Sequence, residues 1–166
     1  YTQGRIAVDY KFFPWLSAGV SGAMSRNNFI TGYYTPSTAE SGRASNGLGN
    51  RTTDYSRMSL LEANVTFNHA FGNHNFNAIL GYSWQKYIDE GFNATNRDFI
   101  TDSFKYNNLN AGNEILDTDI GSYKSSSKLI SFYGRVNYDY SGRYLFTATL
   151  RRDGSSRFGI NIRWGY

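Results

Sequence analysis

The 166-residue sequence contains no cysteine, only two prolines and only two histidines. The absence of cysteine excludes disulfide scaffolds, iron–sulfur centres, cysteine-ligated zinc and thiol catalysis. The sequence also has no run of about 18 apolar residues, so it predicts no transmembrane helix. A transmembrane β-barrel is still compatible with it, because barrel strands are short and only half apolar.

Charged residues are scarce as well, at 18% of the chain, and the formal net charge is +4. The cations are dispersed, and only Arg151 and Arg152 are adjacent. A nucleic-acid interface needs clustered cations along one surface. We therefore expect no nucleic-acid partner and interpret most of the charge as solubilising.

Aromatic residues are abundant, at 17% of the chain, which argues against disorder. Apolar and polar residues alternate with a period of two, which is typical of half-buried or half-lipid-exposed strands. The alternation occurs in three pairs of runs, at about 5–10 and 16–25, 55–69 and 76–87, and 128–139 and 144–151.

The connections between these runs alternate in length. Short turns at 11–14, 71–74 and 141–143 close the pairs, whereas long polar segments at 26–54 and 88–127 join one pair to the next. Short turns at one end and long loops at the other are typical of an outer-membrane barrel. The sequence therefore predicts an all-β fold, an antiparallel meander of about six strands that forms part of a large transmembrane β-barrel.

The alternation also assigns side chains to two faces of the predicted sheet. The apolar face should contact lipid, and its members are Leu16, Ala18, Val20, Leu61, Ala63, Val65, Phe76, Ala78, Leu80, Phe132, Val136, Phe146 and Leu150. The polar face should line the lumen, and its members are Ser17, Ser21, Asn64, Thr66, Asn77, Ser83, Ser131, Asn137, Thr147 and Thr149.

Six strands are too few to close a membrane barrel. Single-chain outer-membrane barrels have eight or more strands, and open sheet edges are costly in lipid because their backbone groups have no partner. We therefore expect residues 1–166 to be a fragment of a longer barrel protein.

Several segments resemble one family. The run RRDGSSRFG at 151–159, followed by RWGY at 163–166, resembles a signature of the SusC/RagA-type TonB-dependent outer-membrane receptors. Ile162 departs from the pattern, which typically has asparagine there. Four upstream segments are similar to the same family in the same order, namely TDYSR (53–57), NRDF (96–99), YNNL (106–109) and IGSYK (120–124).

This resemblance implies a large barrel of about 22 strands with an N-terminal plug, the plug and the remaining strands lying outside residues 1–166. It implies import of oligosaccharides or peptides across the outer membrane of a Gram-negative bacterium, in contact with outer-membrane lipid. It also implies a SusD-like surface lipoprotein as a lid, and a TonB complex that acts through the plug.

The residues themselves offer no catalytic constellation, so we predict no enzyme, no metal site and no cofactor. The acidic group Glu114, Asp117 and Asp119 lacks the glycine and the terminal glutamate of a calcium loop, and we expect it in a solvated outer loop. Two other functions stay open: a soluble β-sandwich module that binds carbohydrate, and a receptor of the same fold for iron chelates or cobalamin.

Aromatic side chains in the long polar segments are the candidate ligand contacts. Sugar rings pack their apolar face on aromatic rings, and ligand sites are commonly lined by aromatic residues. The candidates are Tyr33, Tyr34, Phe92 and Tyr106. The competing interpretation is that these rings pack within their own loops.

Overall fold

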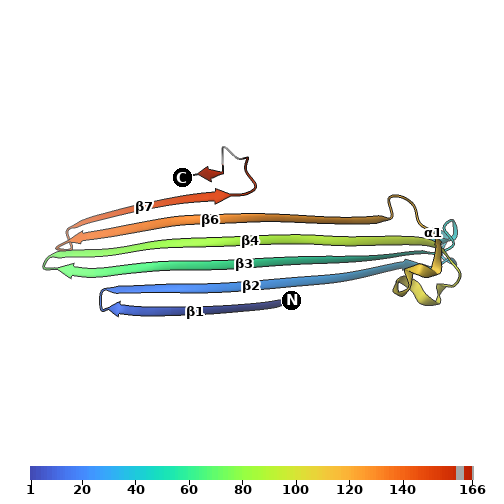
Figure 1. Cartoon of the computed structure of the whole chain (residues 1–166), viewed down its shortest axis with the longest axis horizontal. Coiled ribbons are helices and arrows are strands. Elements are labelled where there is room, and N and C mark those ends of the chain that lie inside the picture. Colours follow the sequence, from blue (N-terminus) through green and yellow to red (C-terminus); the bar gives the residue numbers. More distant parts are fainter. Residues whose placement is uncertain (160–162, 166) are drawn as a thin grey trace. The chain divides into compact units, whose positions relative to one another are not determined.

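The computed structural model describes residues 1–159 and 163–165, so Ile162 and Tyr166 fall outside the described residues. One antiparallel sheet runs in the order β1-β2-β3-β4-β6-β7-β8, with β5 paired to β4 (Figure 1). Its strands are β1 (Thr2–Phe13), β2 (Leu16–Thr35), β3 (Leu48–Phe71), β4 (His74–Phe99), β5 (Gly112–Glu114), β6 (Ile120–Tyr140), β7 (Tyr144–Ser155) and β8 (Trp164–Gly165). The helical turns are α1 (Glu40–Arg43), η1 (Asp102–Asn107) and η2 (Leu109–Ala111).

The predicted antiparallel meander is confirmed. Its six long strands form three hairpins, β1–β2, β3–β4 and β6–β7. The first turn is shifted from the predicted 11–14, because β1 continues through Phe13 and leaves only Pro14 and Trp15 between the strands. None of the helices among the described residues is long and apolar enough to cross a membrane.

The four inner strands are longer than the hydrophobic pattern predicts. β2, β3, β4 and β6 contain 20, 24, 26 and 21 residues. The prediction of long loops at 26–54 and 88–127 is therefore wrong for most of both segments, and the loops proper are 36–47 and 100–119. Polar residues occur on both faces of these strand extensions, so hydrophobic alternation could not reveal them.

The chain divides into two compact units. The turn unit comprises Thr2–Ser25, Arg57–Tyr87 and Ser126–Tyr166, and it holds the three short turns. The loop unit comprises Tyr1, Arg26–Ser56 and Ile88–Ser125, and it holds the two loops.

The polar face of the turn unit is held together by side-chain hydrogen bonds across strands. Asn137 Nδ2 donates to Asn77 Oδ1 at 3.3 Å, and Thr147 Oγ1 donates to Asn137 Oδ1 at 3.0 Å. The ring of Tyr133 lies directly over Gly81, where a larger residue would collide with it. These contacts place the predicted polar residues of β4, β6 and β7 on one face.

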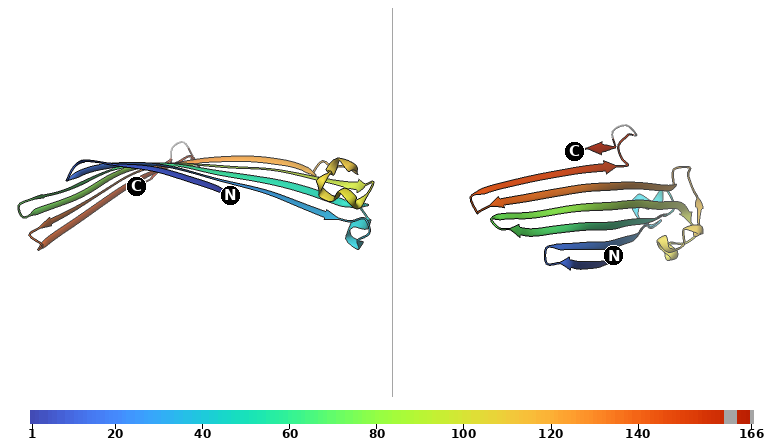
Figure 2. Two further views of the ribbon diagram at one scale, coloured as in Figure 1. Left: turned by 90° about the horizontal axis from the view of Figure 1, so that it is seen from below. Right: turned by 60° about the vertical axis from the view of Figure 1, so that its left-hand side comes forward.

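The opposite face of the turn unit is apolar and uncovered. Leu80 lies against Gly134, and the rings of Tyr82 and Phe132 are 5.2 Å apart. Leu80 and Leu150 are each 66% exposed. Figure 2 shows these strands as a single layer. The only buried hydrophobic residues in the described ranges, Ile88 and Phe99, belong to the loop unit, so the apolar set does not converge on a closed interior as a β-sandwich requires.

Aromatic rings gather beside the short turns. Phe13 stacks on Trp15 at 4.9 Å, and Trp15 meets Phe67 at 5.6 Å. At the next turn, Phe76 meets Tyr138 at 4.8 Å. Such a belt is typical of strand ends at a membrane–water interface.

Candidate functional site

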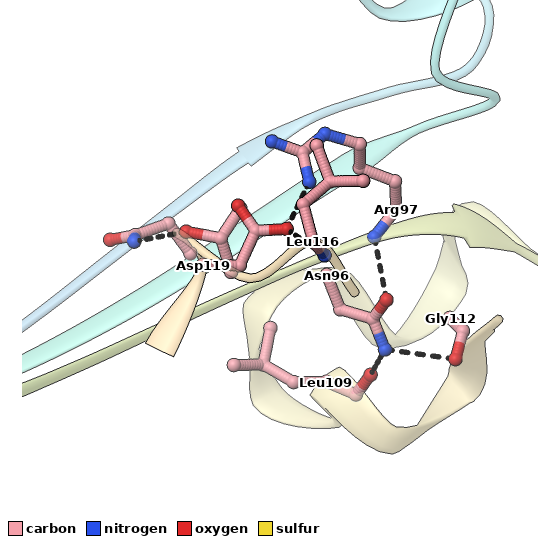
Figure 3. A network of polar contacts seen from close by, with 8 residues as sticks. Asn96, Arg97, Leu109, Gly112, Leu116 and Asp119 are labelled. Atoms are coloured by element: carbon pink, nitrogen blue, oxygen red, sulfur yellow. Dashed lines mark hydrogen bonds and ion pairs between the residues drawn. The ribbon is translucent and has the colours of Figure 1, made fainter. Parts of the chain in front are cut away.

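The loop unit is organised by the last residues of β4, the NRDF segment at 96–99. Asn96 is 3% exposed, and its Nδ2 donates to the carbonyl oxygens of Leu109 and Gly112, both at 2.8 Å (Figure 3). Its Oδ1 accepts from the backbone N–H of Arg97 at 2.8 Å. One buried amide thus fastens the second loop onto β4. It adds a side-chain donor to two carbonyl groups of that loop, and the Leu109 carbonyl also accepts from the backbone N–H of Gly112.

The next residue, Arg97, forms an ion pair with Asp119 across 22 positions of sequence. Asp119 is 5% exposed and also accepts from the backbone N–H of Leu116 at 2.6 Å. The hydrogen bond from Arg97, followed by that from Leu116, holds the pKa of Asp119 below its usual value. The expectation of a solvated acidic group is therefore wrong for Asp119, although Glu114 and Asp117 are exposed.

The third residue, Asp98, joins β4 to the first loop. Asn46 Nδ2 donates to Asp98 Oδ1 at 2.8 Å, and the Phe99 N–H donates to the Asn46 carbonyl at 3.0 Å. Asp98 has φ 55° and Asn46 has φ 45°, a left-handed conformation that Asn and Asp tolerate better than most residues. The two loops are thereby fixed to the same strand end.

Asp102, at the start of η1, connects the second loop to β2. Its carboxylate accepts from Tyr34 Oη at 2.6 Å and from the N–H and Oγ of Ser37 at 3.0 and 2.9 Å. Burial, aided by the Asp102 hydrogen bond, raises the pKa of Tyr34 to about 12, and the Tyr34 hydrogen bond lowers the pKa of Asp102. Gly47, with φ 90°, lies against Tyr34 Oη, where a Cβ atom would crowd the hydroxyl.

This arrangement makes a polar, internally bonded platform from the two loops. Asp98, Asp102 and Asp119 all have side-chain partners, and the described residues hold no cluster of three potential metal ligands. Apolar side chains project from the second loop: Ile100 is 80% exposed and Ile115 is 56% exposed, with Phe104 and Leu116 exposed beside them in sequence. The platform therefore presents these apolar side chains at its surface.

The four aromatic candidates do not form one site. Tyr34 packs edge-to-face on Phe99 at 5.2 Å beneath the loops. The ring of Tyr106 lies against Gly32, on the same side of β2 as Tyr34. Tyr33, which is 60% exposed, points to the other side of that strand.

Phe92 lies in a separate open groove of the loop unit. It is 50% exposed, and the other groove residues are Thr53, Tyr55, Glu90, Gly91, Ser122, Tyr123 and Lys124. Glu90 and Lys124 form an ion pair at 2.7 Å there. Tyr33 and Phe92 are thus the candidates with accessible rings, whereas Tyr34 and Tyr106 have packing partners within the loops.

Residue-by-residue reasoning missed the members of the network that orders the loops. Asn96, Arg97 and Asp98 carry no periodicity signal, because each is paired with a residue far away in sequence. Two signals were available: the NRDF run as a block of family resemblance, and the Asn46-Gly47 dipeptide, which is typical of a tight turn.

No protein-family profile matches the sequence. TonB-dependent receptor P3 of Formosa agariphila is 35% identical over 157 residues, which cover 95% of this chain and 16% of the relative. The TonB-dependent receptor SusC of Bacteroides thetaiotaomicron is 52% identical over 44 residues, covering 26% of this chain and 4% of the relative.

Among solved structures, the RagAB peptide transporter matches 98% of this chain with a TM-score of 0.84 at 17% identity. The match covers 19% of the RagAB chain. At this identity the match supports the fold alone. The antiparallel sheet described above therefore has the same backbone fold as a segment of that transporter.

Proposed function

We propose a transport function for this chain, which belongs to the SusC/RagA-type TonB-dependent receptors. It spans only 16% of the first relative's length, so residues 1–166 are a fragment of the barrel domain in this proposal, and the plug belongs to the remainder of the receptor. The complete receptor would import oligosaccharides or peptides through the outer membrane of a Gram-negative bacterium.

The observation that supports this function best is the uncovered apolar face of the turn unit. Its large side chains are exposed, with Phe146 61% and Val20 53% accessible. Such a face is stable in lipid but is a liability in water. It disfavours the soluble β-sandwich module. The 52% identity to a stretch of SusC favours an oligosaccharide or peptide importer over a receptor for iron chelates or cobalamin.

The loop platform is the proposed contact surface for a SusD-like lipoprotein lid. Exposed Ile100, Phe104, Ile115 and Leu116 lie on a loop held by the Asn96 and Asp119 contacts, and protein interfaces favour preordered apolar anchors within a polar rim. Tyr33 is the proposed ligand-stacking residue, because Phe92 shares a face of β4 with Lys86 and Glu90. The TonB complex would act through the plug, and no catalytic activity is proposed for the chain.

Uptake by the complete receptor tests this function. Cells carrying the wild-type receptor should take up labelled oligosaccharide or peptide only when TonB is active. Replacing 103–117 by a glycine–serine linker, which keeps Asp119, should impair uptake or lid capture while the receptor stays in the outer membrane. Uptake that continues without TonB, or a receptor absent from the outer-membrane fraction, would contradict the proposal.

A further inference from the structure

The apolar face of the turn unit carries charge only at one end. From the short turns outward, this face of β3, β4, β6 and β7 contains no lysine, arginine, aspartate or glutamate until one position on each strand. The first charged residues are Arg57 on β3, Lys86 on β4, Lys128 on β6 and Arg152 on β7. All four are basic, and we call them the basic row.

Contacts place Arg152 on the apolar face. It pairs across the sheet with Phe132, whose ring faces Tyr82 at 5.2 Å. Its guanidinium lies over the ring of Trp164 at 5.0 Å from the ring centre, a cation–π geometry. Phe132 and Trp164 are themselves stacked at 6.3 Å.

Strand register places Lys86 and Lys128 opposite each other. Counting four residues outward from Tyr82 on β4 and from Phe132 on β6 reaches Lys86 and Lys128. The same register recurs four residues further along both strands, where Glu90 and Lys124 are paired at 2.7 Å. The two lysines therefore occupy the same face as Tyr82 and Phe132.

Arg57 joins the row by alternation. Its neighbour Met58 accepts a hydrogen bond at Sδ from Gln85, which lies on the polar face, so Arg57 points to the apolar side.

The row is oblique: Arg152 pairs with Phe132, four residues closer to the turns than Lys128. The ends of the hairpins are offset in the same direction. Trp15, in the first turn, lies opposite Asn68, whose N–H donates to the Trp15 carbonyl at 2.8 Å, whereas β3 continues three residues further, to Phe71. Tilted barrel strands produce this offset.

The height of Lys86 and Lys128 fits the edge of a bilayer. Lys128 lies 140 − 128 = 12 residues from Tyr140 at the short turn. At about 3.3 Å per residue and a tilt of about 40°, this span crosses ~30 Å, the thickness of the hydrocarbon core. Trp84, two residues from Lys86 on the same face, and Trp164 beneath Arg152 are the residue type that marks the headgroup level.

We propose that the basic row binds the phosphate groups of an outer-leaflet lipid. The inference rests on the proposed function, since it needs this face to contact the outer membrane. The four cations form one oblique row on four neighbouring strands, and the next acidic residue outward on the β4 face, Glu90, is already paired with Lys124. Charge complementarity therefore favours a phosphorylated headgroup as the occupant.

The test uses the complete receptor, purified and placed in phosphatidylcholine nanodiscs with a minor fraction of diphosphorylated lipid A. Native mass spectrometry counts the lipid A molecules that stay bound. The variant Lys86→Gln, Lys128→Gln, Arg152→Gln should retain about tenfold less lipid A than the wild type. The matched control Arg5→Gln, Arg135→Gln, Arg151→Gln removes the same charge from the polar face and should retain it normally.

A second, charge-preserving variant guards against misfolding. Lys86→Arg, Lys128→Arg, Arg152→Lys should bind as the wild type does, and retention should weaken as salt rises. Two results would overturn the proposal: equal retention of dephosphorylated lipid A by the wild type, or undiminished retention by the glutamine variant. Either would mean that the lysines and arginines of the row extend into solvent without binding lipid phosphate. Because this measurement needs neither TonB nor uptake, failed uptake with charge-dependent lipid binding would refute the proposed transport and leave the basic row intact.

Discussion

The turn unit and the loop unit differ in how many of their side chains are buried. The turn unit buries almost nothing: Ser131 is its only residue among the buried polar and hydrophobic ones in the described ranges. The loop unit buries Asn96, Asp119, Thr35, Ile88 and Phe99. The first unit depends on its surroundings to cover an apolar face, whereas the second carries its own polar and aromatic interior.

This difference indicates which interactions each unit needs. An apolar face in lipid is sensitive to charge and depth, and tolerates exchange among apolar residues. A buried polar network depends on each partner, because a buried donor or acceptor without a partner costs free energy. Substitutions of each kind should therefore act in one unit and leave the other nearly unchanged.

The largest expected effect is a charge placed in the apolar face. In the complete receptor, Val65→Arg should lower the free energy of unfolding from bilayers by about 2–4 kcal/mol, the cost of arginine near the membrane midplane. Thr66→Arg, on the neighbouring polar face, is the matched control and should cost less. Denaturant unfolding of receptor in vesicles measures both. Equal costs would show that the two faces do not have different surroundings.

Removing the buried amide of Asn96 should have the next largest effect. Asn96→Ala removes the side-chain donor from the carbonyl groups of Leu109 and Gly112, of which Leu109 keeps the backbone N–H of Gly112. The loss should cost about 1–3 kcal/mol of local stability. Limited proteolysis should show faster cleavage within 100–119 and an unchanged turn unit. The exposed Asn107→Ala is the control. Unaltered cleavage in the Asn96 variant would mean that the loop is held by other contacts.

The loop unit should also be sensitive to pH at both extremes. Asp102 and Asp119 have lowered pKa values, so their contribution is present above the unfolded value of about 4 and is lost as pH falls through their folded pKa values. Tyr34 has its pKa raised to about 12, so its contribution is present below about pH 10 and is lost as pH rises through 12. The protection factor of the 100–119 amides, which divides out the intrinsic pH dependence of hydrogen exchange, measures both limits.

Tyr34→Phe separates the two limits. The variant should lose the alkaline transition of the loop while keeping an acid transition from Asp119. A wild-type loop whose protection factors do not change between pH 9 and 12 would contradict the role assigned to the Tyr34 hydroxyl.

The smallest expected effect concerns the ion pair in the groove. Lys124 is 67% exposed and Glu90 is 39% exposed, so solvent screens their attraction. Glu90→Gln should change stability by about 0–1 kcal/mol. Thermal unfolding of the complete receptor at low and high salt measures it, with Gln85→Ala of the turn unit as the comparison. A larger loss would indicate that the groove is structurally coupled to the loops.

The turn unit could be predicted from sequence because its rule is periodic. In the run from Leu61 to Phe67 every second residue is apolar, and that regularity alone fixes strand, face and partner hairpin. The dispersed cations were harder to interpret. Arg57, Lys86, Lys128 and Arg152 lie far apart in sequence, and only strand register places them in one row.

The loop unit could not be predicted in the same way. Its strand extensions, such as the part of β4 from Ile88 to Phe99, interrupt the apolar alternation with charged residues such as Glu90. Its stability comes from specific pairs such as Arg97 with Asp119. A pair separated by 22 residues has no local signature. The NRDF resemblance indicated where the network lies, and the structure shows which contacts these residues make.

The adjacent arginines of β7 bear on how the barrel wall assembles without error. β6 and β7 pair without a break from Leu129 with Ser155 to Tyr140 with Tyr144. A slip by one residue would exchange every side chain between the faces. Arg151 would then face the membrane, and Leu150 would face the lumen. A misaligned hairpin would thus be less stable in the membrane than the correctly aligned one. This difference in stability would favour the correct alignment during insertion.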